Sequence, residues 1–288
     1  MNILAAAFCI ILFSLTVPFT RIAALEISPI AIIFLRLIGA SIICGISAWI
    51  DGWIPPRRAW PGIFATSLGS VIGFSSLTAF AMKEVPSGHA AVALAAMPIA
   101  TAAYSVLRDR LNPGSKFWFF AITGTALSFA FFFFMNVSAL VQGDFLLILA
   151  VFAAAFGYVE GGRMSRQFSG KRVMSWAILF TLPLTLPAAI YFFSQTDFQA
   201  ETVTLPVWLS VAYLALVSQS TGMFLWFKVL AIGPMEKIAL VQLLQPFFTL
   251  LASIIFLQET VSGATWVIAA LVGACIFGAN QEKKKSLG

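Results

Sequence analysis

Ten apolar stretches, each about as long as a helix that crosses a membrane, take up most of this 288-residue chain. A helix that rises 1.5 Å per residue needs about 20 apolar residues to cross the hydrocarbon core of a bilayer. Charged residues make up 10% of the sequence, whereas a soluble domain averages about 25%. The sequence therefore predicts an all-α integral membrane protein with ten transmembrane helices. The predicted spans are 3–21, 29–50, 60–82, 88–107, 116–135, 144–163, 173–193, 206–228, 235–257 and 263–280.

The positions of Lys and Arg predict the side of the membrane on which each loop lies, because cytoplasmic loops carry an excess of basic residues. With the N terminus inside, 14 of the 17 basic residues fall in cytoplasmic loops, at their span ends or in the C-terminal tail. Arg21 and Lys83 then lie outside, and Arg36 is embedded in the second span. We therefore expect both termini to be cytoplasmic. The net charge of +6 follows from this topology and does not indicate a nucleic-acid partner.

A proline in the fourth span has a counterpart in the ninth span, 148 residues later. Aligning residues 84–99 with 232–247 at this offset brings three pairs into register: Pro86 with Pro234, Pro98 with Pro246 and, further on, Trp118 with Trp266. Five spans per copy is an odd number, so the second copy must enter the membrane from the opposite side. The sequence thus predicts two inverted five-helix repeats, residues 1–138 and 139–288, which form one membrane-embedded unit. This arrangement is typical of transporters that expose one site alternately to the two faces.

The two prolines are candidate gating residues, because a proline inside a helix leaves the carbonyl four residues earlier without its donor. In lipid, such a carbonyl needs a partner in the protein or in a wet cavity. Gln242 and Gln245 stand beside the predicted break at Pro246. Two amides with an unpaired carbonyl can bind an ammonium or a carboxylate group of a substrate. Alternatively, the glutamines only satisfy the kink and hold neighbouring helices together.

Two further spans carry candidate substrate-binding residues. Gln219 lies midway along the eighth span, within the polar run 218–221. Arg36 lies about seven residues into the second span, beyond easy reach of the outer surface. A charge at this depth costs about 2.5–3.5 kcal/mol on insertion scales, so it is a candidate functional residue. Two roles fit Arg36: it holds a substrate carboxylate, or it is a structural cation bonded to helix ends.

Four other residues within the spans have alternative functional and structural interpretations. Glu160, near the cytoplasmic end of the sixth span, either pairs with Arg163 one helical turn later or couples transport to protons at an inner gate. His89, the single histidine, opens the fourth span at the outer side and either senses pH there or is a helix-end polar group. Tyr104 and Tyr158 either line the substrate pathway or pack with their hydroxyl groups satisfied.

Residues 13–42 and 232–278 resemble EamA-type carriers of the drug/metabolite transporter superfamily. In residues 13–42, the first span ends in a basic residue, a short Ser-Pro turn follows and Arg36 lies early in the second span. In residues 232–278, the proline of the ninth span, Glu259 and a glycine-rich tenth span fit the same family. The resemblance implies an exporter of small metabolites in a bacterial inner (plasma) membrane, of a type close to aromatic-amino-acid exporters. Two departures are Leu111, where the second repeat has Glu259, and Glu160 in the sixth span.

The composition favours a secondary carrier that works by alternating access. No nucleotide-binding loop is present, and one histidine with no paired carboxylates inside a span argues against a membrane enzyme; no metal or cofactor is expected. The sparse interior charge favours a zwitterion or a small neutral metabolite, with the lipid bilayer as the surroundings and a monomer or weak dimer as the assembly. The alternative is a proton-coupled exporter of lipophilic cations that uses Glu160.

Overall fold

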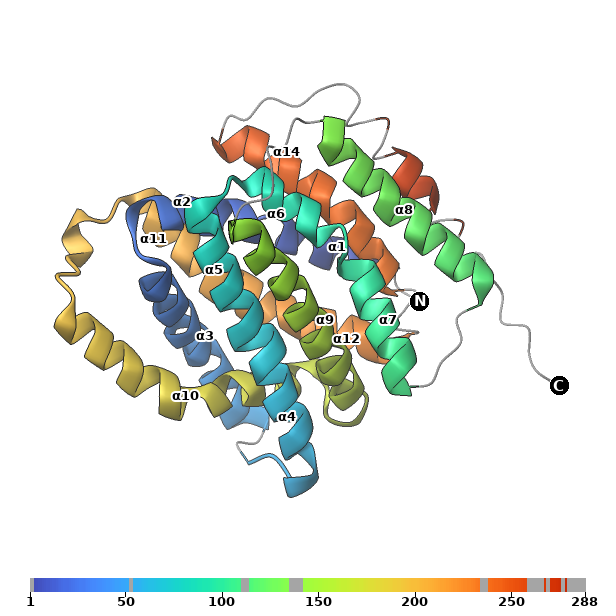
Figure 1. The fold of residues 1–288 in the computed structure, drawn as a ribbon. Helices are drawn as coiled ribbons and strands as arrows, with labels where there is room; N and C mark the ends of the chain where they lie inside the picture. The colour runs from blue at the N-terminus through green and yellow to red at the C-terminus, as the bar shows by residue number, and fades with distance from the viewer. Residues whose placement is uncertain are drawn as a thin grey trace.

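The computed structural model describes residues 3–51, 54–109, 114–134, 142–233 and 238–257, together with 267, 270–275 and 278. Within these residues the fold is a bundle of helices without strands (Figure 1). The helices α4 and α5 run in one line through the middle of the view, with α9 beside them and α8 at the edge of the bundle. The prediction of an all-helical chain is confirmed for this part of the protein.

Six helical segments of the described chain are long and apolar enough to cross a membrane, and each coincides with a predicted span. They are Leu4–Glu26, Pro29–Asp51, Arg57–Glu84, Gln142–Phe168, Gly170–Gln195 and Leu205–Ile232. The first is built from α1 (Ile3–Ser14) and α2 (Thr16–Glu26), and the second is α3 (Pro29–Asp51). The third joins η1 (Arg57–Ala59), α4 (Trp60–Thr66), η2 (Ser67–Gly73) and α5 (Phe74–Glu84).

The remaining long segments are α9 (Gln142–Phe168), α10 (Gly170–Gln195) and the composite of α11 (Leu205–Ala212), η4 (Tyr213–Thr221) and α12 (Gly222–Ile232). A short turn, η3 (Ala200–Thr202), connects α10 with α11. With six such segments, the protein is a multi-pass membrane protein.

Three of the other predicted spans are also helical, but they are not counted among the six long segments. The fourth is split into α6 (Ser87–Leu94) and α7 (Met97–Asp109), the fifth is α8 (Ser115–Phe134), and the ninth joins η5 (Leu240–Leu244) to α14 (Gln245–Leu257). Most of the tenth span, 263–280, lies outside the described residues, as do Pro234 and Trp266. The number of ten spans and the inverted repeat therefore stay predictions.

The two prolines predicted to act in gating, Pro98 and Pro246, occupy the same place at the start of an α-helix. Pro98 is the second residue of α7, and Pro246 is the second residue of α14. The α-helix before Pro98 ends at Leu94, and the backbone N–H of Ala96 donates to Ala93 at 3.0 Å in a tightened turn. A proline is tolerated in the first turn of a helix, where its missing N–H would have no partner, so the chain restarts a helix there.

Two π-helical segments widen the third and eighth spans near their middles. They are η2 (Ser67–Gly73) and η4 (Tyr213–Thr221), and shifting the first by 148 residues gives 215–221, inside the second. Hydroxyl groups of Ser220 and Thr221 donate to the carbonyls of Ala215 and Leu216, five residues earlier, at 2.7 and 2.9 Å. A π segment adds a residue to a turn and is frequent at functional sites. Here it places polar residues on the inner side of both spans.

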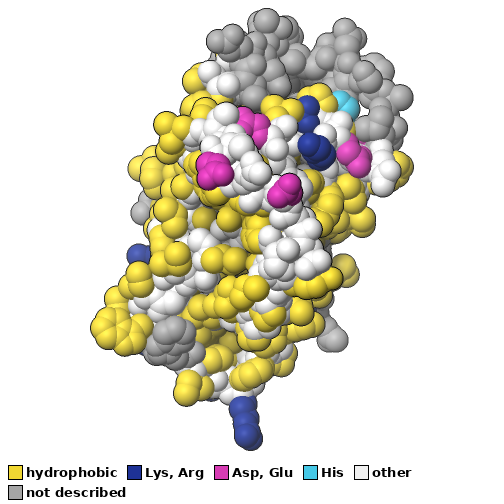
Figure 2. Space-filling model, turned by 90° about the vertical axis from the view of Figure 1, so that its left-hand side faces the viewer, with side chains coloured by type: hydrophobic (Ala, Val, Ile, Leu, Met, Phe, Trp, Pro, Cys, Tyr) yellow, Lys and Arg dark blue, Asp and Glu magenta, His cyan; other side chains and the backbone are white. Residues whose placement is uncertain are grey.

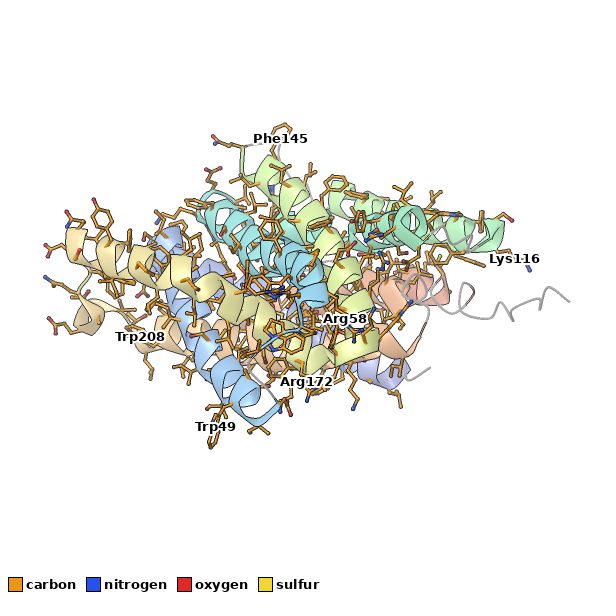
Figure 3. All side chains as sticks on the ribbon, turned by 90° about the horizontal axis from the view of Figure 1, so that it is seen from below. Trp49, Arg58, Lys116, Phe145, Arg172 and Trp208 are labelled. Atoms are coloured by element: carbon orange, nitrogen blue, oxygen red, sulfur yellow. The ribbon has the colours of Figure 1, made fainter. Side chains whose placement is uncertain are left out.

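The surface of the bundle is apolar, as expected for a protein surrounded by lipid. Trp49, Ile42 and Phe152 are 76%, 62% and 61% exposed. Figure 2 shows a broad hydrophobic face with the Asp and Glu side chains gathered at its upper end. Seen from below, Trp49, Phe145 and Lys116 project from the periphery, while Arg58 and Arg172 lie over the middle (Figure 3).

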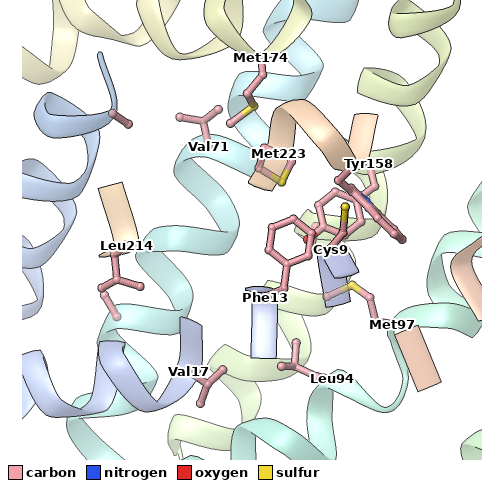
Figure 4. Close-up of a cluster of buried hydrophobic side chains, with 14 of the residues drawn as sticks. Cys9, Phe13, Val17, Val71, Leu94, Met97, Tyr158, Met174, Leu214 and Met223 are labelled. Carbon is pink, nitrogen blue, oxygen red and sulfur yellow. The ribbon is translucent and has the colours of Figure 1, made fainter. Parts of the chain in front are cut away.

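An aromatic cluster holds the centre of the bundle together. Trp226 is fully buried and makes edge-to-face contacts with Phe13 and Tyr158, with ring centroids 6.0 and 5.8 Å apart. Figure 4 shows Phe13, Tyr158 and Met223 converging from α1, α9 and α12. Edge-to-face aromatic pairs contribute about 0.5–1.5 kcal/mol each beyond their buried area. This cluster forms one wall of the cavity described next.

Candidate substrate cavity

A small cavity lies at the centre of the bundle, between the breaks and the π segments. It encloses about 20 Å³, which is room for about one water molecule. The cavity as it stands is therefore too small for a metabolite. Its walls are formed by Phe13, Thr16, Val17, Arg36, Ser70, Phe74, Tyr158, Ser218, Gln219, Met223 and Gln245.

Among the described residues that line this wall, Arg36 is the only charged one. Its side chain is buried, with the residue 3% exposed, and one terminal nitrogen donates to the Ser218 hydroxyl at 3.4 Å. The Nε atom has no hydrogen-bond partner, and among the residues that the structure describes no carboxylate forms an ion pair with this guanidinium. A buried charge is normally paired or coordinated. Arg36 therefore leaves an uncompensated positive charge beside the cavity.

Gln219 connects the two π segments across the cavity. Its side-chain oxygen accepts a hydrogen bond from the Ser75 hydroxyl at 3.0 Å, and its side-chain nitrogen donates to the Ser70 carbonyl at 3.5 Å. Both bonds are at the long end of the usual range.

Gln245 reaches the cavity but Gln242 does not. Gln245 is 5% exposed and lines the wall, and its backbone carbonyl accepts a hydrogen bond from the Ser14 hydroxyl at 3.3 Å. Gln242 is fully buried in η5, and neither atom of its amide has a hydrogen-bond partner within the described part of the chain. The sequence placed both amides in one pocket, whereas the structure separates them. Gln242 belongs to η5, whereas Gln245 is the first residue of α14.

Hydroxyl groups form a part of the site that the sequence did not single out. Thr16 and Ser218 share a hydrogen bond of 2.8 Å across the cavity wall, from α2 to η4. Ser70 lines the same wall with its hydroxyl unpaired among the described residues. Ser and Thr often bond to their own helix, so their sequence positions alone carry little signal. The sequence contained one indication that such hydroxyl groups belong to the site, because Ser218 is part of the polar run 218–221.

Glu160 and Tyr104 lie in a separate cleft at the lower end of α4, α7 and α9, which encloses about 610 Å³. One oxygen of Glu160 accepts from Arg108 Nε at 2.7 Å and from the Tyr104 hydroxyl at 3.2 Å. The predicted contact with Arg163 in the same helix is longer, at 3.8 Å. The nearest partner of Glu160 is thus an arginine of another helix, which sequence spacing does not reveal.

His89 pairs with an acidic residue at the opposite end of α9. Its Nδ1 lies 2.7 Å from Oδ1 of Asp144, with side chains 12% and 10% exposed. The sequence analysis did not single out Asp144, which is the first residue of the predicted span 144–163. The sequence contained one signal for this pair. His89 and Asp144 each open a predicted span, and both span ends lie on the same predicted side of the membrane. Neither His89 nor Asp144 lines the central cavity.

Two basic residues clamp the upper ends of α2 and α5 together. Arg21 donates to the carbonyl of Met82 at 2.6 Å, and Lys83 donates to the carbonyl of Ala24 at 3.1 Å. Each cation thus satisfies the last turn of the other helix, where the helix dipole favours positive charge. This reciprocal contact closes the bundle over the upper side of the cavity wall formed by the two helices.

Comparison with known proteins gives a consistent result over the full chain. A model of the EamA-like transporter family matches residues 1–137 and again residues 141–281. The uncharacterized transporter YdeK of Bacillus subtilis (strain 168) is 32% identical over 276 residues, covering 96% of this chain and 95% of that protein. The uncharacterized transporter YvbV of the same organism is 22% identical, covering 98% and 93%. One crystal structure superposes with a TM-score of 0.76 at 17% identity, covering 97% of this chain and 98% of that one.

Proposed function

Because the chain belongs to the EamA-like transporter family, we propose that it is a secondary carrier that exports small metabolites, and amino acids in particular, across a bacterial inner membrane. The protein is a transporter and not an enzyme. The proposal adds a substrate class, a direction and a mechanism to that family assignment. It also places both termini in the cytoplasm, as the distribution of basic residues predicts.

The observation that carries the substrate class is the unpaired guanidinium of Arg36 in the wall of the central cavity. A substrate carboxylate would supply the missing anion and form a charge-assisted hydrogen bond, the strongest kind available in such a site. The side-chain oxygens of Gln219 and Gln245 and the hydroxyl of Ser70 can accept hydrogen bonds from an ammonium group. Phe13, Phe74 and Met223 supply an apolar wall for a side chain. Together these groups suit a zwitterion with an apolar side chain.

Alternating access fits the symmetric placement of the breaks. The prolines at the starts of α7 and α14, and the π segments η2 and η4, recur at one offset of 148 residues. Inverted repeats with interrupted helices rock about a fixed site. In this interpretation the structure is the occluded state, because the cavity of about 20 Å³ is too small for an amino acid. Opening then requires that the contacts of Arg21 and Lys83, or those at Glu160, separate.

The test of substrate class is counterflow in liposomes that contain the purified protein. We expect the Gln245→Ala variant to lose about tenfold in amino-acid exchange, because one hydrogen bond to a charged group contributes about 1.5–3 kcal/mol. Gln195→Ala is the matched control, since Gln195 is an exposed residue at the end of α10 and should leave exchange unchanged. Absence of exchange for every amino acid in the wild-type protein would refute the substrate class.

Proton-coupled export of lipophilic cations is the alternative function, and it depends on Glu160. A coupling carboxylate must exchange its proton, whereas Glu160 is held by Arg108 and Tyr104. We therefore expect the Glu160→Gln variant to retain amino-acid counterflow within about threefold, since a rim pair with one exposed arginine contributes less than about 1 kcal/mol. Dye efflux driven by a pH gradient, lost in Glu160→Gln, would favour the alternative.

A further inference from the structure

The cleft that contains Glu160 carries more positive charge than its carboxylates neutralise. Four arginines and two carboxylates line it, so the formal charge of its wall is 4 − 2 = +2. Arg108 pairs with Glu160 at 2.7 Å, and Arg163 pairs with Asp109 at 3.0 Å. These two pairs account for both carboxylates.

Arg58 and Arg166 are the two arginines left over. No carboxylate in the described ranges forms an ion pair with either residue. Both are exposed at the mouth of the cleft, from η1 and from the last turn of α9. The Arg58 guanidinium lies 5.4 Å from the centre of the Phe168 ring, a contact that orients it without neutralising its charge. An anion at this mouth would meet two guanidinium groups.

An apolar groove follows the basic cleft along the same pair of helices. It encloses about 430 Å³, and its apolar lining includes Ala96, Ala100 and Ala103 of the α7 side and Ile148 and Phe152 of α9. The paired side chains of His89 and Asp144 also line this groove. Tyr104 and Phe156, whose rings are 5.4 Å apart edge to face, line the adjoining end of the basic cleft. From Ala96 to Tyr104 the helix rises about 12 Å at 1.5 Å per residue, close to half of the hydrocarbon core.

The basic cleft and the apolar groove follow one another along α7 and α9, and this order indicates which kind of molecule binds there. A soluble anion would use the basic mouth and leave the apolar groove empty, and a neutral apolar compound would do the reverse. A lipid of the leaflet that faces Arg58 presents its phosphate at the membrane surface and its chains toward the midplane. Basic pockets between transmembrane helices on the cytoplasmic side bind such head groups. The proposed topology puts Arg58 and Arg166 on that side.

We propose that the seam between α7 and α9 binds an anionic phospholipid of the cytoplasmic leaflet, with its phosphate between Arg58 and Arg166 and one acyl chain along the groove of Ala96, Ala100 and Ala103. The site is separate from the central cavity and shares no lining residue with it. Lipid binding therefore does not require that the central cavity holds an amino acid.

Lipid retention by the detergent-purified protein, measured by native mass spectrometry, tests this site. We expect the apparent dissociation constant of phosphatidylglycerol to rise about tenfold in Arg58→Gln/Arg166→Gln, which corresponds to about 1.4 kcal/mol. Arg57→Gln/Arg172→Gln is the matched control, because it removes two exposed arginines outside the cleft. Equal weakening in both double variants, or equal retention of phosphatidylglycerol and phosphatidylcholine by the wild-type protein, would overturn the proposal.

The acyl part of the site is tested with the arginines intact. Ala100→Leu fills the groove from an intermediate, partly exposed position of α7 and should weaken phosphatidylglycerol binding about threefold or more. Millimolar glycerol phosphate should not displace the lipid, because it lacks a chain. Two results together would contradict the lipid assignment: glycerol phosphate displaces the lipid, and the Ala100→Leu variant binds phosphatidylglycerol as tightly as the wild type. They would show instead a site for soluble phosphate esters. None of these measurements uses transport, so their outcome is independent of the amino-acid test.

Discussion

Replacing Arg36 by glutamine is expected to abolish amino-acid exchange without lowering the stability of the protein. Truncating one partner of a buried, hydrogen-bonded charge pair costs about 2–5 kcal/mol, so the apparent affinity should fall about 100-fold. Burial of the free guanidinium itself costs about 2.5–3.5 kcal/mol on insertion scales. Glutamine removes that cost and can still donate to the Ser218 hydroxyl, which accepts from the guanidinium at 3.4 Å. Counterflow and the melting temperature in detergent are the two measurements.

The comparison of these two readouts separates a substrate-binding arginine from a structural one. A structural cation bonded to helix ends would, when removed, lower the melting temperature and leave exchange per folded molecule unchanged. Arg36→Lys keeps the charge but loses the planar fork of donors, so its exchange should lie between those of the wild type and Arg36→Gln. Arg57→Gln, at an exposed position of η1, is the control for loss of one arginine. A lower melting temperature with normal exchange would disprove the substrate role.

Adding a single methyl group at Gly157 is expected to destabilise the fold strongly. A Cβ atom there would overlap the Ser70 hydroxyl and backbone nitrogen and would lie 3.0 Å from the carbonyl carbon of Gly69. The contact is reciprocal, since a Cβ at Gly69 would lie 2.6 Å from the backbone nitrogen of Gly157. These neighbours are mostly backbone atoms and cannot rotate away. Overpacking of this kind costs about 1–3 kcal/mol, and we expect Gly157→Ala to lie at the upper end.

Gly88→Ala provides the same chemical change where there is space. Apart from its chain neighbours and the backbone of its own helix, no atom of the described residues lies within 4 Å of a Cβ built at Gly88, in the first turn of α6. Alanine should therefore stabilise this helix by about 0.5–1 kcal/mol, because it loses less backbone entropy on folding. Melting temperatures and size-exclusion profiles of the two variants should shift in opposite directions. Equal melting temperatures would show that the η2 and α9 backbones can separate without cost.

Length and hydropathy were enough to locate most of the helices. A span needs a fixed number of apolar residues and few charges, so a stretch such as 29–50 is recognisable as a span, and α3 occupies Pro29–Asp51. The repeated prolines marked places where a helix can change form, and α7 and α14 each begin one residue before Pro98 and Pro246. A proline alone does not decide this, because α10 continues through Pro183 and Pro187. The costs of burying charge and amide groups likewise marked Arg36, Gln219 and Gln245 as candidates, and all three line the central cavity.

Contacts between helices could not be read in the same way. Glu160 has Arg163 one turn away in sequence, yet its shortest contact is to Arg108, 52 residues earlier. Gln242 and Gln245 are three residues apart, and only the second reaches the cavity. Asp144 was recognised as a partner of His89 only when α6 and α9 were placed together.

The physical reason for this division lies in the range of the interactions. Hydrophobic length, helix propensity and the missing N–H of proline act within one segment, so the order of residues contains them. Which face of one helix meets which face of another depends on the packing of small residues such as Gly69 and Gly157, and on the shift in side-chain direction that a π or 3-10 segment introduces. Those rotations decide whether a polar residue lines the cavity or is buried away from it, and they exist only in the assembled bundle.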